Sequence, residues 1–176
     1  RFRFTAYSYE VNATFGLYFL TFALGCMRTA LNNWDMPITI GQDNGAEFCS
    51  GSPRKVTDWN NTLKPLNASI YAYNPYWDIR KNLIERSHRT DDEEFLIPRG
   101  EFIYTEEEFM KEARSYGTYW NTTRSHSGIG MQGRTPLEVI QQSGLLGASR
   151  LTKIPVLILD QHIRTLQECV TPLLLA

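Results

Sequence analysis

The residues that could do chemistry begin with Asp43, which directly follows a β-branched run over 38–42. A strand that ends on an aspartate projects a carboxylate past the edge of a sheet, where it can bind a metal ion or move a proton. The next residues, Asn44 and Gly45, tolerate positive φ and therefore also suit a plain hairpin turn. This stretch alone is compatible with both interpretations.

A second carboxylate, Glu85, lies in a segment whose pattern predicts a helix from an Asn82 N-cap to about Phe95. Ile84 and Phe95 are three helical turns apart and should share a buried face. The opposite face is expected to be an exposed ridge, because its polar residues are spaced i, i+3, i+4 and i+7: Glu85, His88, Arg89 and Asp92.

Positive charge gathers in two places in a chain whose formal net charge is only −1. The first cluster surrounds Glu85 and consists of Arg80, Lys81, Arg86, His88 and Arg89. The second lies in a Gly-rich loop over 121–136 and consists of Arg124, His126 and Arg134. Local basic patches of this kind are typical of proteins that bind a phosphate backbone. For the first cluster, the alternative is an ordinary solvated helix with i,i+4 ion pairs.

Length and composition predict a single domain of ordinary soluble character. The chain has 176 residues, of which 42% are hydrophobic and 21% are charged. Its three cysteines are widely spaced, and its three histidines lack zinc-finger spacing. This pattern argues against a disulfide framework or a cysteine zinc site, and it favours a reducing cytoplasm. The apolar run over 13–27 is short for a bilayer span and is expected to be a core helix.

Strand and helix patterns alternate along the chain, which predicts an α/β fold. Thr105 and Thr135-Pro136 are each expected to cap a helix, and three glutamates after Thr105 suit the first turn of the first of these. Acidic residues over 91–94 fall late in the helix that carries Glu85, where negative charge interacts unfavourably with the helix dipole. They are expected to form a solvated face of that helix. The expected strands are 1–10, 38–42, 68–73 and 154–160, and the earlier helices are 14–31 and 53–63.

Three segments together resemble the integrase catalytic core of insertion-sequence transposases, within the retroviral-integrase superfamily. They are QDNGAEF (42–48), NLIERSHRTDDEEF (82–95) and YWNTTRSHSGIGMQGRTPLE (119–138). A lone Asp-Asn-Gly is a weak signal, whereas the three motifs in this order and approximate spacing are a strong one. The similarity runs from Arg1 to about Glu138.

The resemblance implies an RNase-H-like fold, a mixed sheet flanked by helices, with an Asp-Asp-Glu (DDE) catalytic triad. Asp43 matches the second aspartate and Glu85 matches the glutamate. The first aspartate is expected on a strand upstream of Arg1, and neither Glu10 nor Asp35 is assigned to the triad. The implied cofactor is a pair of Mg²⁺ or Mn²⁺ ions held by these carboxylates, because hard oxygen ligands suit such ions.

The implied function is DNA transposition and integration, in which the metal ions assist cleavage of a DNA end and its transfer to target DNA. Expected DNA contacts are Arg86, His88, Arg89, Arg124 and His126. Residues 1–142 would form the catalytic core, which would be truncated at its N-terminus and so nearly inactive by itself. Residues 143–176 would form a C-terminal helical extension. Transposon ends, target DNA and further copies of the chain are the expected partners, in a prokaryotic cytoplasm. Two alternatives are a non-catalytic DNA-binding remnant of a transposase and an RNase-H-like nuclease.

Overall fold

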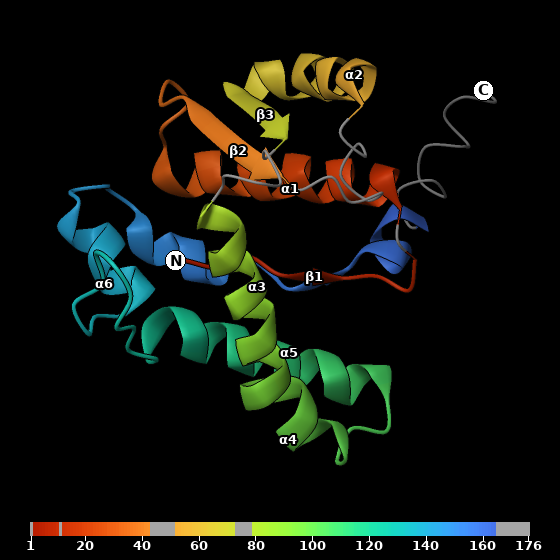
Figure 1. The fold of residues 1–176 in the computed structure, drawn as a ribbon, viewed down its shortest axis with the longest axis vertical. Helices are drawn as coiled ribbons and strands as arrows, with labels where there is room; N and C mark the ends of the chain where they lie inside the picture. The colour runs from red at the N-terminus through yellow and green to blue at the C-terminus, as the bar shows by residue number, and fades with distance from the viewer. Residues whose placement is uncertain (1, 11, 43–51, 73–78, 165–176) are drawn as a thin grey trace.

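The chain has a mixed α/β architecture, shown in Figure 1. The computed structural model describes residues 2–10, 12–42, 52–72 and 79–164, with the side chains of 79–84 outside that description. Its strands form two separate parallel pairs, β1–β4 and β2–β3, where the sequence predicted one mixed sheet. The elements up to the middle of the chain are β1 (Ala6–Tyr7), α1 (Ala13–Leu31), β2 (Ile38–Gln42), α2 (Pro53–Leu63), a 3₁₀ turn η2 (Lys64–Leu66) and β3 (Ala68–Ala72).

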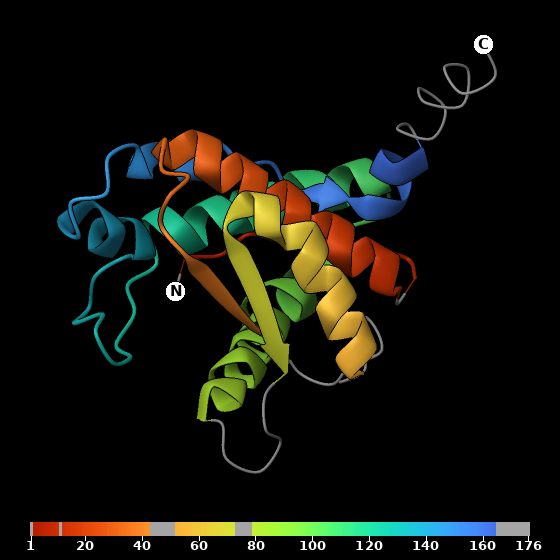
Figure 2. The same ribbon diagram turned by 90° about the horizontal axis from the view of Figure 1, so that it is seen from above.

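The β2–α2–β3 unit carries the main apolar core. β2 and β3 pair in parallel, from Ile38 opposite Ala68 to Gln42 opposite Ala72. Figure 2 shows α1 and α2 beside these strands, and side chains of both helices meet the same core. The sequence prediction of β2 and α2 is confirmed at both ends of each element. The buried members of this core are Leu24, Trp59, Leu63, Ala68 and Ile70.

A buried arginine ties the end of α1 to the connection that enters β3. Arg28 is 1% exposed. Its guanidinium donates to the Leu66 carbonyl from Nε at 3.1 Å and from Nη2 at 2.9 Å, and further bonds reach the carbonyls of Asn67 and Asn33. A buried charge requires such a set of acceptors, so Arg28 fixes how α1 meets the strand pair.

Helix α1 ends as predicted, at a left-handed Asn32 with φ of 48°. It has 19 residues, and among the described helices it is the one long and apolar enough to span a membrane by length and composition. The apolar run over 13–27 lies within this helix, which the sequence predicted over 14–31. In the structure part of its surface packs into the core described above, through Leu24 and neighbouring apolar side chains.

The second half of the chain begins with a long helical rod: α3 (Ile79–Asp91), the π-helical turn η3 (Asp92–Leu96) and α4 (Ile97–Gly100). The predicted N-cap at Asn82 is wrong, because α3 begins at Ile79 and Asn82 lies within it. The rod crosses α5 (Glu106–Thr122), and the stacked rings of Phe95 and Tyr116, 4.9 Å apart, join them. Phe95 is buried as predicted.

Both predicted capping sites are confirmed. Thr105 caps α5 and Thr135 caps α6 (Pro136–Gln142), and in each case a glutamate three residues later completes a capping box. The predicted loop over 121–136 begins later than expected, because α5 continues to Thr122.

Segments from the first and last parts of the described chain meet in the β1–β4 pair, where Ala6 lies opposite Leu157 and Tyr7 opposite Ile158. Each strand has only two residues, where longer strands were predicted at 1–10 and 154–160, and 159–164 is helical. The described part of the predicted extension, 143–164, packs against α1. Its 3₁₀ helix η4 (Ala148–Lys153) buries Leu151 against Ala30 and Leu31.

Candidate nucleic-acid and metal site

The strand that should carry the first matched carboxylate ends where the motif begins. β2 stops at Gln42, and Asp43 follows it in the sequence but lies outside the described residues. The expectation that Asp43 and Glu85 meet in space therefore stays a prediction. The Gln42 side chain is buried, with 4% of the residue exposed, and neither its Nε2 nor its Oε1 has a partner among the described residues. A buried amide without partners carries a desolvation cost, here beside a predicted catalytic position.

The exposed ridge predicted on α3 is present. Glu85, His88 and Arg89 lie on this helix with exposed side chains, and the fourth predicted member, Asp92, is exposed at the start of η3. Arg86, on the same helix, is exposed as well. Arg89 Nε donates to Glu93 at 2.8 Å in an i,i+4 ion pair, with side-chain exposures of 79% and 57%. Such a pair is weak in water, so it leaves Arg89 available to a phosphate. It is also what the solvated-helix alternative predicts.

The second basic cluster has internal partners instead. Arg124 forms a two-pronged ion pair with Glu94, in which Nε donates to Oε2 at 2.7 Å and Nη2 to Oε1 at 2.5 Å. Its guanidinium also lies 4.7 Å from the centre of the Trp120 ring. Arg134 donates to the backbone carbonyls of Met131 and Gly130, within its own loop.

His126 is 4% exposed and packs edge-on against Trp120, with ring centres 4.7 Å apart. Arg124 Nη1 lies 3.1 Å from His126 Nδ1. Because arginine only donates, Nδ1 must accept, which places the ring proton on Nε2, 3.5 Å from the Trp120 carbonyl oxygen. The backbone N–H of His126 also donates to the Arg134 carbonyl at 3.1 Å, near the end of the Gly-rich loop. These contacts give His126 a packing role.

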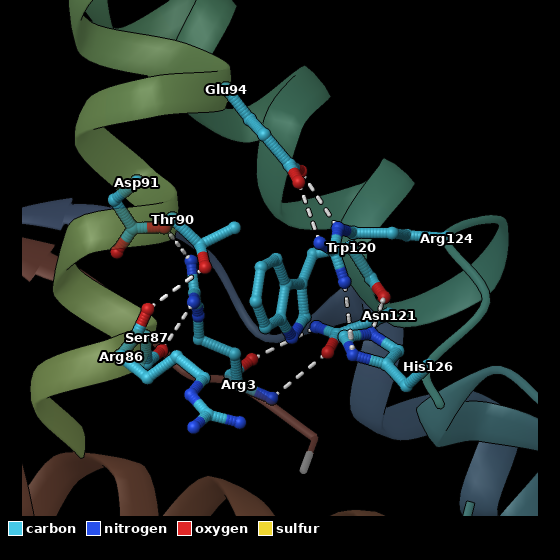
Figure 3. A network of polar contacts seen from close by, with 10 residues as sticks. All are labelled: Arg3, Arg86, Ser87, Thr90, Asp91, Glu94, Trp120, Asn121, Arg124 and His126. Carbon is cyan, nitrogen blue, oxygen red and sulfur yellow. Dashed lines mark hydrogen bonds and ion pairs between the residues drawn. The ribbon is translucent and has the colours of Figure 1, made fainter. Parts of the chain in front are cut away.

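Figure 3 shows that this cluster belongs to a larger network that joins the start of the chain to α3 and α5. The Arg3 guanidinium lies 3.5 Å from the centre of the Trp120 ring, so the indole contacts two arginines. Arg3 also bonds to Asp91 and to Ser87. Asn121 pairs with the Arg3 backbone in both directions at 2.9 Å. We name this set the arginine–tryptophan network: Arg3, Asp91, Glu94, Trp120, Asn121, Arg124 and His126.

The network accounts for two acids of the run at 91–94, for which the sequence predicted a solvated face: Asp91 pairs with Arg3 and Glu94 with Arg124. Asp92 and Glu93 are exposed, as that prediction expects, and Glu93 pairs with Arg89 outside the network. The rod also continues to Gly100, so these acids lie in its middle rather than at a C-terminal end. The hydrogen bond from Arg124 is the main reason that the pKa of Glu94 lies below its usual value.

Sequence reasoning missed Arg3, Trp120 and Asn121 as members of one network. Trp120 and Asn121 lie in a motif that the sequence had already singled out, but their partner Arg3 is 118 residues away from Asn121. An aromatic residue and an amide at the end of an amphipathic helix were a signal for packing. No local pattern could supply the partner.

The residues that could hold a metal are Asp43 and Glu85. Among the described residues, no group of three or more histidine, cysteine, aspartate or glutamate side chains is arranged to bind one. Glu85 is an exposed carboxylate on α3, and Asp91 and Glu94 pair with arginines. Glu85 is the one residue of the predicted metal-binding pair that lies among the described residues. No protein-family model, curated protein or solved structure matches this chain.

Proposed function

We propose that this chain is the catalytic core of a DDE-type transposase that cuts a DNA end and joins it to target DNA. The observation that carries the proposal is that β2 ends at the residue before Asp43, while Glu85 stands exposed among cationic residues on α3. The parallel β2–α2–β3 unit also suits an RNase-H-like fold, in which a strand end presents a carboxylate.

In this proposal, Asp43 and Glu85 hold Mg²⁺ or Mn²⁺. Two such metal ions, when bound, would stabilise charge on the attacking and leaving oxygens of an in-line phosphoryl transfer. Arg86, His88 and Arg89 share the helix of Glu85 and bind DNA phosphates beside it. Arg124 and His126 act through packing: Arg124 ties η3 to the loop after α5 through Glu94, and His126 packs that loop on Trp120 of α5.

Strand transfer of a pre-cut, labelled oligonucleotide end tests the catalytic part. The chain, extended upstream through the strand expected to carry the first aspartate, is compared with its Asp43→Asn and Glu85→Gln variants in Mg²⁺ and in Mn²⁺. Each change should lower joining at least ~100-fold, because it removes a group that supports charge stabilisation. Glu101→Gln is the matched control, since it neutralises an exposed acid at the end of α4, outside the predicted ridge.

Full joining by Glu85→Gln would refute the triad assignment. If no form joins DNA, yet all forms bind it, the DNA-binding remnant is the correct function. Hydrolysis of DNA without any joining would instead identify a nuclease.

The DNA-binding part is tested by the salt dependence of binding to duplex DNA. Arg89→Ala should weaken binding to all sequences and reduce the slope of log affinity against log salt by about 1, because one phosphate contact is lost. Arg99→Ala is the matched control. Arg99 is an exposed arginine on α4 that also has a glutamate partner, Glu112 at 2.8 Å. Equal slopes for the two variants would remove Arg89 from the DNA interface.

A further inference from the structure

A hollow of 410 Å³ lies between the two-stranded β1–β4 pair and the start of α5. Residues from three separate segments line it: 7–9, 103–106 with Phe109, and Ile158. Four of these nine lining residues are aromatic: Tyr7, Tyr9, Tyr104 and Phe109. No residue of the proposed catalytic and DNA-binding set contributes to it.

The aromatic residues form an inner wall and a rim. Tyr7 and Phe109 pack edge to face, with ring centres 4.7 Å apart and planes at 79°. Burial raises the pKa of Tyr7 to about 12, so its phenol is neutral at physiological pH. Tyr9 and Tyr104 stand at the rim, 74% and 83% exposed. Aromatic faces carry partial negative charge, so this lining favours a positively charged guest.

One charged side chain lines the hollow among the described residues, and it is a carboxylate. Glu106 Oε2 accepts a hydrogen bond from the Tyr9 hydroxyl at 2.6 Å, and its Oε1 accepts one from Gln161. Both donors are neutral, so they orient the carboxylate without cancelling its charge. A carboxylate with two such partners keeps further acceptor capacity for a cation.

The N-terminus of a helix generally favours an anion, but backbone N–H groups at the start of α5 already donate to side chains of the chain itself. Thr105 Oγ1 accepts from the Glu108 backbone at 3.2 Å, and the Glu108 carboxylate accepts from the backbones of Tyr104 and Thr105 at 2.9 and 3.0 Å. Glutamates occupy the first three helical positions, 106–108. They offset the positive end of the helix dipole, so an anionic guest is disfavoured.

We propose that this hollow binds an organic cation of the alkylammonium or guanidinium type, with the aromatic rings around the cation and Glu106 as its counter-charge. The cation is either a free amine or the side chain of a lysine or arginine on another protein. The proposal is independent of the transposase proposal, because it uses neither the same residues nor the same chemistry.

Chemical-shift titration of the full chain with choline, spermidine and Nα-acetyl-arginine methylamide tests the site. The neutral isostere of choline, 3,3-dimethylbutan-1-ol, is the ligand control. We expect choline to bind at least ~10-fold more tightly than the alcohol, since the two differ mainly in charge. Tighter binding of the arginine derivative than of spermidine would indicate a protein side chain as the source, and the reverse order would indicate a free amine.

Two variants connect the binding to the hollow. Glu106→Gln and Tyr104→Ala should each weaken choline binding ~5-fold or more, whereas Glu101→Gln, which neutralises an exposed acid outside the hollow, should not. Tyr104 is largely exposed, so its replacement tests the site even if Glu106→Gln unfolds. Equal affinity for choline and the alcohol, no binding of any cation, or unchanged binding in Tyr104→Ala would overturn the proposal.

Discussion

Replacing Arg124 with glutamine should destabilise the fold by about 2 kcal/mol and leave DNA binding unchanged. The half-buried, two-pronged pair with Glu94 contributes ~1 kcal/mol. Stacking on Trp120 adds ~0.5 kcal/mol, and the bond to His126 adds a similar amount. For a chain of this size, the melting temperature should fall by roughly 4–8 °C.

The assay combines thermal unfolding with DNA binding at several salt concentrations. A double-mutant cycle with Glu94→Gln should give a coupling of ~1 kcal/mol, because either single change removes the same ion pair. The sequence placed Arg124 among the DNA contacts, and that alternative makes the opposite prediction. An unchanged melting temperature together with a salt slope lowered by about 1 would show that Arg124 is a DNA ligand rather than part of the arginine–tryptophan network.

The same pair should make stability depend on pH. The pKa of Glu94 is lower in the folded chain than its usual value of 4.5, chiefly through its hydrogen bond with Arg124. A lowered folded pKa contributes stability that is fully present above the unfolded pKa and is lost as the pH falls through the folded value. The stability difference between the native chain and Glu94→Gln should therefore be constant near pH 7 and shrink below about pH 4.5. A difference that grows on acidification would contradict this assignment.

Three further changes test the packing. Arg28→Met should cost about 3 kcal/mol in denaturant unfolding, because the carbonyls that it binds lose their donor, and Arg28→Lys should recover part of that loss. Gly147→Ala should lower the unfolding free energy more than Gly144→Ala does. Both glycines have φ near 80°, but a Cβ on Gly147 would also lie 2.3 Å from the Ala30 oxygen. Equal unfolding free energies for the two variants would contradict that close approach. Gln42→Leu should raise the unfolding free energy by about 1 kcal/mol by removing a buried amide that has no hydrogen-bond partner among the described residues, and a loss of stability would show that the amide has a partner elsewhere.

Several parts of the fold could be predicted from sequence because their causes are local. The strand over 38–42 follows from β-branched residues in a row. The starts of α5 and α6 follow from a threonine with a glutamate three residues later, and the end of α1 from an asparagine that tolerates positive φ. Each of these signals acts within one turn of backbone. The start of α3 was misplaced, because Asn82 suits both an N-cap and an ordinary helical position.

The sequence by itself determined which residues could do chemistry: an aspartate after a strand, a glutamate on an exposed helical ridge, and two groups of basic residues. Only the tertiary structure decided how the two groups differ. Arg89 stays exposed with an i,i+4 partner on its own helix, whereas Arg124 meets Glu94 from another element and His126 is buried on Trp120. The physical reason is that a charge's role depends on its burial and its partners, and contacts between residues 30 to 118 positions apart leave no periodic signal in the sequence.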